Sequence, residues 1–210
     1  MAVRFKLTDL TRVLRSGVVL RRIQCIRPLE GVAVGDLGGW VESESNLSEY
    51  AWVADDAMVF GNALVYENAR VSGNALVCDS VEIFGDAKVR GAALVCDNAV
   101  VRDNVIIQGC ATVYESAQVY GGAVVGGNAQ VLGNAQVYGD AEIKDLACIN
   151  GRARVFGNAT VEAGSLISGG AVVKGDARIR GDSVVLGTAT VCGRYVVDHK
   201  LVLYASVYTC

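Results

Sequence analysis

The sequence has almost no histidine and almost no proline: each occurs once among the 210 residues, as His199 and Pro28. One chain therefore cannot assemble a metal site with several imidazole ligands, such as the three-His zinc site of a carbonic anhydrase. Any general base of the histidine type would have to be His199. Histidine-based chemistry is thus restricted to a single candidate.

Long apolar runs and an excess of positive charge are also missing. No stretch approaches the ~18 consecutive apolar residues of a membrane helix, and residues 1–19 lack the apolar core of a signal peptide. The formal net charge of −3 argues against a nucleic-acid partner, because phosphate contacts need concentrated Lys and Arg. We expect a cytoplasmic protein without membrane association and without a cofactor.

Cysteine pairs of the CxxC type are absent, although the chain has seven cysteines. Their odd number and scattered positions predict reduced thiols, and a disulfide remains open. Cys78 and Cys96 lie 18 residues apart. Because two thiolates without further ligands make a poor zinc site, we expect no metal site.

What the sequence does contain is Val, Ala and Gly, which supply 35, 26 and 25 residues. An apolar fraction of 52% excludes intrinsic disorder. Gly does not recur at every third position, which excludes collagen, and the abundance of Gly and Val disfavours a coiled coil. Short strands joined by tight turns remain.

A six-residue repeat runs without interruption through positions 51–192. A small residue stands at 51 and at every sixth position to 189, with Ala at 20 of these 24 sites. Two residues further on, the 24 positions from 53 to 191 hold 18 Val and six Ile. Gly followed by Asn or Asp commonly precedes the small residue, as at Gly61 and Asn62, and tolerates the positive φ of a tight corner. Three hexads would then close one triangular coil whose axis is filled by Val and Ile.

The pattern Val-x-Gly-Asn-Ala-x resembles the hexapeptide repeat of the left-handed β-helix superfamily, and the chain is most similar to YdcK-like proteins of bacteria and phages. The resemblance implies an all-β fold, a single-stranded left-handed parallel β-helix shaped as a triangular prism of about eight coils. Left-handedness follows from the resemblance alone. The superfamily includes acyltransferases, nucleotidyltransferase tails, γ-type carbonic anhydrases and structural proteins, so the resemblance does not select one function.

Three segments follow from the repeat. Residues 1–50 lack it and are expected to form an N-terminal β cap, because an open end of a β-helix exposes strand edges. Residues 51–192 form the β-helix, and residues 193–210 are expected to form a C-terminal cap or an oligomerisation strand. The acidic residues Glu42, Glu44, Glu49, Asp55 and Asp56 are interpreted as a solvated collar.

With 18 residues in a coil, outward side chains fall into columns, and one pair of columns is largely apolar. A monomer rarely exposes a contiguous apolar patch larger than a few hundred Å², so we expect this face to bind a second copy of the chain. The resemblance implies a homotrimer, and a face-to-face homodimer is the alternative. The expected interface residues, here called the apolar face, are Met58, Phe60, Leu76, Cys78, Leu94, Cys96, Tyr114, Leu132, Leu166 and Leu186.

Other outward residues are candidates for ligand binding. Arg70, Lys88, Arg90, Arg102 and Tyr120 fall on neighbouring coils, and Arg beside an aromatic ring suits a flat anionic ligand such as a nucleotide. The alternative interpretation is that these charges keep an apolar rod in solution.

His199 is the only candidate for a catalytic residue. It lies outside the regular hexads, and Asp198 would point to the opposite side on a strand. The chain also lacks the inserted loops that commonly accompany the catalytic His of the superfamily. We therefore expect a non-catalytic structural or interaction protein, associated with a phage or mobile element; an acyl-CoA-dependent acyltransferase and a protein that sequesters a small anionic ligand are the alternatives.

Overall fold

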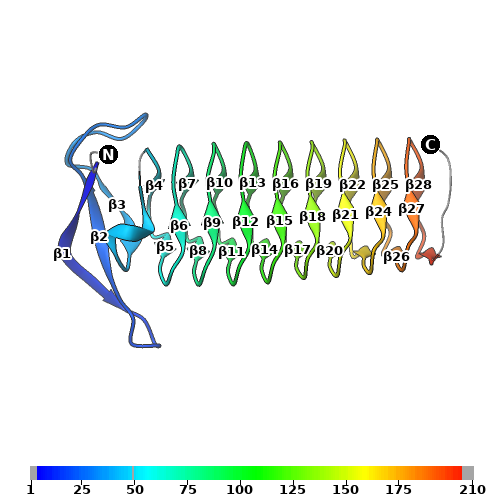
Figure 1. Ribbon diagram of the computed structural model, residues 1–210, viewed down its shortest axis with the longest axis horizontal. Helices are drawn as coiled ribbons and strands as arrows, with labels where there is room; N and C mark the ends of the chain where they lie inside the picture. The colour runs from blue at the N-terminus through cyan, green and yellow to red at the C-terminus, as the bar shows by residue number, and fades with distance from the viewer. Residues whose placement is uncertain (1–3, 49, 205–210) are drawn as a thin grey trace.

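The computed structural model describes residues 4–48 and 50–204 and shows a rod of stacked triangular coils, a parallel β-solenoid (Figure 1). Each coil contributes one two-residue strand to each of three sheets, which have 12, nine and eight strands and are here called the first, second and third sheet. Strands β1 and β29 lie at opposite ends of the rod. The all-β solenoid expected from the hexads is confirmed.

The strands of the first sheet are β1 (Phe5–Val13), β2 (Val19–Cys25), β3 (Leu37–Val41), β5 (Met58–Val59), β8 (Leu76–Val77), β11 (Leu94–Val95), β14 (Thr112–Val113), β17 (Gln130–Val131), β20 (Cys148–Ile149), β23 (Leu166–Ile167), β26 (Val184–Val185) and β29 (Val202–Leu203). Those of the second are β4 (Trp52–Val53), β7 (Arg70–Val71), β10 (Lys88–Val89), β13 (Ile106–Ile107), β16 (Val124–Val125), β19 (Glu142–Ile143), β22 (Thr160–Val161), β25 (Arg178–Ile179) and β28 (Val196–Val197). Those of the third are β6 (Leu64–Val65), β9 (Glu82–Ile83), β12 (Val100–Val101), β15 (Gln118–Val119), β18 (Gln136–Val137), β21 (Arg154–Val155), β24 (Val172–Val173) and β27 (Thr190–Val191).

Consecutive coils pair in parallel with a register of 18 residues, as Lys88 pairs with Arg70 on one side and with Ile106 on the other. The amide of an outward residue donates to a carbonyl of the next coil, for example Lys88 N to Val105 O at 2.8 Å. All 24 Val and Ile residues at the axial positions 53–191 are at most 1% exposed. Apolar burial along the axis and the hydrogen bonds between coils therefore hold the rod together.

The corners use the left-handed backbone region that Gly and Asp tolerate. Gly109 has φ +70°, and Asp55 and Glu67 occupy equivalent corners with φ of 57° and 58°. The Asp55 carboxylate accepts a hydrogen bond from Gly73 N one coil later, at 2.8 Å, and Glu67 does the same for Gly85 N at 2.8 Å. These acidic side chains thus satisfy corner amides of the following coil.

The acidic residues interpreted as a solvated collar are exposed at Glu42, Glu44, Asp55 and Asp56, and three of them also accept hydrogen bonds within the chain. Besides Asp55, Glu42 accepts a hydrogen bond from Gly61 N at 2.8 Å, and Asp56 accepts one from the Trp40 indole at 3.2 Å. The Trp40 indole N–H, followed by the positive charge of Arg12, lowers the pKa of Asp56 below its usual value. Glu44 belongs to the short 3-10 helix η1 (Glu44–Asn46), and Glu49 lies outside the described residues.

Asp55→Ala is expected to lower the free energy of unfolding by about 1 to 2 kcal/mol, because Ala loses the bond to Gly73 N and tolerates the left-handed region poorly. Asp55→Asn keeps an oxygen acceptor and adopts positive φ more readily, so we expect it to lose less than half as much. Urea unfolding followed by circular dichroism measures both. Equal losses for the two variants would show that the hydrogen bond and the backbone preference contribute little.

The N-terminal residues continue the first sheet by an antiparallel hairpin, in which β1 pairs with β2 and β2 pairs with β3. Phe5, Ile23 and Cys25 are buried and join the axial core at the start of the rod. The turn between β1 and β2 projects away from the coils (Figure 1). The hairpin therefore both covers the first coil and extends beyond it.

The solenoid is longer than the hexad count predicts. In β3, Trp40 already pairs with Met58 in the 18-residue register, so coiling begins before residue 51. Beyond residue 192, Val196 of β28 pairs with Arg178, and Val202 of β29 pairs with Val184. The rod consequently has about nine turns, as the nine strands of the second sheet show, instead of the expected eight. Six-residue spacing persists to β29 although the small anchor residue is lost after Ala189.

Candidate functional site

The apolar face lies on the outward side of the first sheet, where the columns expected from the sequence are present. Met58 pairs with Leu76, and Leu76 pairs with Leu94, on successive coils. Cys78 is buried at 9% exposure, and the other nine residues of the face are partly exposed. Side chains of successive coils partly cover one another, and a partly exposed apolar strip remains over Met58, Leu76 and Leu94, beyond which Thr112 and Gln130 interrupt the column.

The N-terminal hairpin covers the start of this strip. The Arg12 guanidinium lies 4.5 Å from the Trp40 ring centroid and 3.8 Å from Met58 Sδ, and it forms an ion pair with Asp56 at 3.2 Å. The Arg22 guanidinium also lies near this ring, 5.3 Å from the Trp40 ring centroid. The 18-residue columns of the repeat do not predict this contact, because Arg12 and Met58 are 46 residues apart and Arg12 lies outside the repeat.

The basic candidates are divided between two sheets. Arg70 and Lys88 pair across the second sheet, where Arg70 donates to the carbonyls of Tyr50 at 3.0 Å and Glu30 at 3.3 Å. Burial lowers the pKa of Arg70. A cavity of about 360 Å³ beside them is also lined by the carboxylates of Glu30 and Asp86. The mixed charge of this cavity disfavours an anionic ligand.

Arg90, further along the second sheet, binds Gln108 Oε1 by two hydrogen bonds of 2.7 and 3.2 Å.

Arg102 and Tyr120 follow strands β12 and β15 of the third sheet, whereas Arg70 and Lys88 belong to the second. The Arg102 guanidinium lies 4.4 Å from the Tyr120 ring centroid and forms an ion pair with Asp103 at 3.1 Å. Tyr120 in turn stacks on Tyr138 at 4.8 Å. Arg102 therefore occupies one position in a column of stacked aromatic rings, and its charge is already paired with Asp103. The five basic and aromatic candidates do not form one site.

His199 lies at a corner with φ 62°, and its side chain is 92% exposed. Asp198 does not point away from it as expected on a strand: His199 N donates to Asp198 Oδ1 at 2.7 Å, and Nε2 lies 3.8 Å from Oδ2. Arg180 also binds the Asp198 carboxylate, at 2.8 Å. The corner conformation turns the two side chains to one side, and the imidazole remains in solvent.

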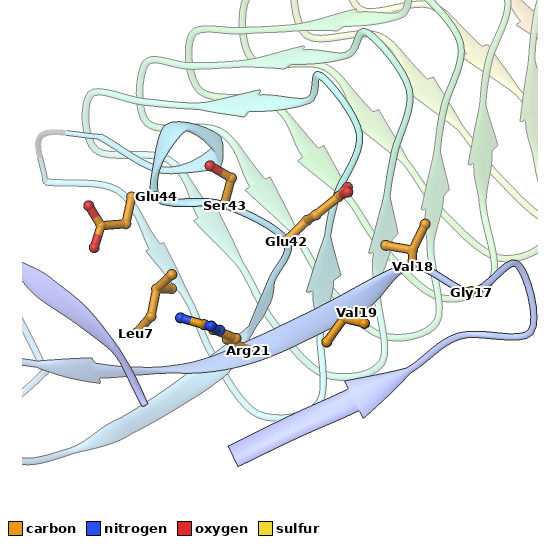
Figure 2. Close-up of a pocket in the computed structure, with 8 residues that line it drawn as sticks. All are labelled: Leu7, Gly17, Val18, Val19, Arg21, Glu42, Ser43 and Glu44. Carbon is orange, nitrogen blue, oxygen red and sulfur yellow. The ribbon is translucent and has the colours of Figure 1, made fainter. Parts of the chain in front are cut away.

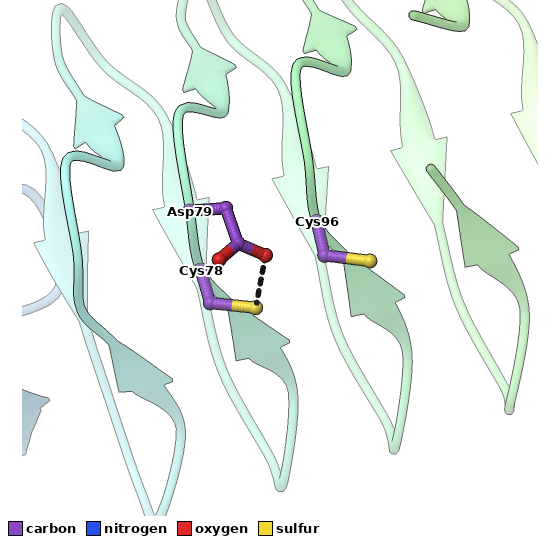
Figure 3. A group of neighbouring side chains, drawn as sticks. All are labelled: Cys78, Asp79 and Cys96. Carbon is purple, nitrogen blue, oxygen red and sulfur yellow. Dashed lines mark hydrogen bonds between the residues drawn. The ribbon is translucent and has the colours of Figure 1, made fainter. Parts of the chain in front are cut away.

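A cluster of two thiols and one carboxylate lies where the first sheet turns into the third (Figure 3). The ligand atoms of Cys78, Asp79 and Cys96 all lie within 4.8 Å of one another, and Cys78 Sγ donates to Asp79 Oδ2 at 3.3 Å. Burial raises the pKa of both thiols, and the charges of Asp79 and Asp97 raise them further. The 18-residue spacing predicted that the two cysteines are neighbours but not that Asp79 lies beside them, although the dipeptide Cys-Asp recurs at 78–79 and 96–97.

The cysteines differ in oxidation state. Within the described part of the chain Cys25, Cys78, Cys96, Cys110 and Cys148 are free, whereas Cys192 is disulfide-bonded. The expectation that all seven thiols are reduced is therefore wrong for Cys192, and the open alternative of a disulfide applies there.

A second concave region lies at the N-terminal hairpin (Figure 2). A cavity of about 630 Å³ separates β2 from the segment that leads into η1, and Arg21, Glu42 and Glu44 are among its lining residues. Val13 and Val19 near the hairpin turn are 67% and 46% exposed. The hairpin thus presents apolar and charged groups together, and no single ligand chemistry follows from them.

Comparison with known proteins agrees with the fold. Residues 153–169 match the family model described as YdcK Beta solenoid repeat. The matched segment contains β21, β22 and β23, which is one strand from each sheet and so one coil. No curated protein matches the sequence. No helix in the described residues is long and apolar enough to cross a membrane. The hexads and the stacked parallel sheets together show a β-solenoid of hexapeptide repeats, one coil of which is similar to the YdcK solenoid repeat.

Proposed function

We propose that the chain is a non-catalytic interaction protein that self-associates through the apolar face. The observation that carries the proposal is the in-register column of Met58, Leu76 and Leu94 on the outside of the first sheet. These side chains are only partly covered by their neighbours. Burying them against a second copy would remove apolar area from water at about 25 cal/mol per Å².

The alternative of an acyltransferase receives less support. A general base must lie within hydrogen-bond reach of the proton it removes, in a site that orients the acceptor. His199 is 92% exposed at a corner, and Asp198, its carboxylate neighbour, is bound to Arg180.

Leu94→Lys is expected to reduce the solution mass to that of a single 22.0 kDa chain. The side chain points outward from β11, so the substitution leaves the axis intact but places a charge in the proposed interface. Multi-angle light scattering at micromolar concentration measures the mass. The wild-type chain should give a dimer or a trimer.

Leu64→Lys is the matched control. Leu64 occupies the equivalent outward position of β6 in the third sheet, is 42% exposed and pairs with Glu82, so a Lys there keeps a favourable neighbour. We expect this variant to retain the wild-type mass. A monomeric wild-type chain, or an unchanged mass for Leu94→Lys, would overturn the proposed interface.

A further inference from the structure

We propose that Cys78, Asp79 and Cys96 bind a thiophilic divalent cation of the Zn²⁺ class. All three ligands belong to one chain, so the site is complete without a second copy, although Cys78 and Cys96 also belong to the apolar face. We expected no metal site from the sequence because two thiolates without further ligands make a poor zinc site. The two thiols do not stand alone, since Asp79 adds a third donor.

The distances suit a single ion. Zinc binds thiolate sulfur at ~2.3 Å and carboxylate oxygen at ~2.0 to 2.2 Å, so donors around one ion lie roughly 3.5 to 4 Å apart. Cys78 Sγ and Asp79 Oδ2 are 3.3 Å apart, and all three ligand atoms lie within 4.8 Å of one another. Small rotations of the side chains therefore bring the donors to coordination distance, with no change in the backbone.

The solenoid holds the donors in place before any ion binds. Cys78 N donates to Val95 O at 3.1 Å, and Cys96 N donates to Val113 O at 3.1 Å, which fixes the two cysteines one coil apart on the same column. Asp79 occupies a left-handed corner with φ 63°, and its Oδ2 accepts from Asp97 N at 3.3 Å. Because the ordering is already achieved by folding, binding orders few additional groups.

The surroundings favour a cation, and the donor set favours a soft one. Asp79 and Asp97 are the charged groups that act on both thiols, and both are acidic. The Asp97 carboxylate accepts from Glu115 N at 2.9 Å, so it contributes charge without being a ligand. Two sulfur donors select ions such as Zn²⁺ over Mg²⁺ and Ca²⁺, which prefer oxygen.

Binding is a proton exchange without oxidation or reduction. The S–H bonds of Cys78 and Cys96 break, two metal–sulfur bonds form, and two protons pass to the solvent. Asp79 contributes an oxygen lone pair as the carboxylate. Three protein ligands leave the fourth tetrahedral position open to an exogenous ligand.

The test is a titration of the full-length, reduced and chelator-treated protein with Co²⁺, followed by displacement with Zn²⁺. We expect one Co²⁺ per chain, a sulfur-to-cobalt charge-transfer band and its loss when Zn²⁺ is added. Cys78→Ser and Cys96→Ser should abolish the band. Asp79→Asn should weaken Co²⁺ binding at least tenfold while retaining a side chain that adopts the left-handed corner.

Cys148→Ser is the matched control, because Cys148 is also a free, partly exposed thiol of the first sheet but lies outside the cluster. It should leave the band and the stoichiometry unchanged. Absence of the band in the wild-type protein, or its persistence in Cys78→Ser with unchanged circular dichroism, would overturn the site. Because Cys78 and Cys96 also belong to the apolar face, the solution mass is measured on the same samples. A wild-type mass with the band lost assigns the effect to metal binding, and a monomeric wild-type chain that still gives the band overturns the interface alone.

Discussion

Gly39→Val is expected to lower the free energy of unfolding by about 3 kcal/mol, the largest loss we expect from a substitution outside the axis. Gly39 is buried in β3, where the hairpin joins the first coil. A Cβ at this position would lie 2.6 Å from Ala57 O and 2.6 Å from Val53 Cγ1. Neither neighbour can move freely, because Val53 is an axial residue and Ala57 O accepts the hydrogen bond of Trp40 N. Overpacking of this kind typically costs 1 to 3 kcal/mol or more.

Gly126→Ala provides the comparison. Gly126 has no positive φ, and an added Cβ would meet only the flexible Gln108 side chain, at 3.4 Å. We expect a change of less than about 0.5 kcal/mol. Both variants are measured by urea unfolding monitored by circular dichroism. If Gly39→Val were as stable as Gly126→Ala, the close contact between β3 and the first coil would not exist in solution.

The sequence was sufficient to predict the repeating part of the rod. Each hexad imposes the same requirement, a small residue and a β-branched residue facing one axis. A strand assignment that fits one coil therefore fits every other coil. The 18-residue register followed from three hexads closing a coil, and Arg70, Lys88 and Ile106 do pair in that order.

Contacts outside the repeat could not be predicted by the same argument. The hairpin meets the coils through Arg12, Trp40 and Met58, whose proximity depends on a long-range packing arrangement and has no periodic signal. The ends of the solenoid were also misplaced, because Val202 continues the register without the Ala anchor on which the boundary was based.

The thiol cluster illustrates an intermediate case. The column placed Cys78 beside Cys96, but Asp79 follows a strand and its direction depends on the left-handed corner, with φ 63°. On a continued strand Asp79 would point away from Cys78. Corner conformation, rather than strand alternation, decides which side chains meet at the edges of the prism, and it does so again for Asp198 and His199.

Ile107→Ala is expected to lower the free energy of unfolding by about 2 to 5 kcal/mol, the usual cost of removing a large buried aliphatic side chain. Ile107 is fully buried on the axis between Val89 and Val125 of the adjacent coils. These neighbours are held by hydrogen bonds along the rod and cannot collapse into the space that Ala would leave. Removal of the same atoms from a site that can relax would cost less.

Ile106→Ala is the matched control, because it removes the same side-chain atoms as Ile107→Ala. Ile106 belongs to the same strand, β13, but points outward and is only partly buried. Ile106→Ala should therefore cost less than about 1 kcal/mol, since the atoms it removes are partly in contact with water and no closed cavity remains. Urea unfolding of the two variants at one protein concentration gives the difference directly. Equal losses for Ile106→Ala and Ile107→Ala would contradict the division of every hexad into an axial and an outward side, on which the fold, the apolar face and the thiol cluster all depend.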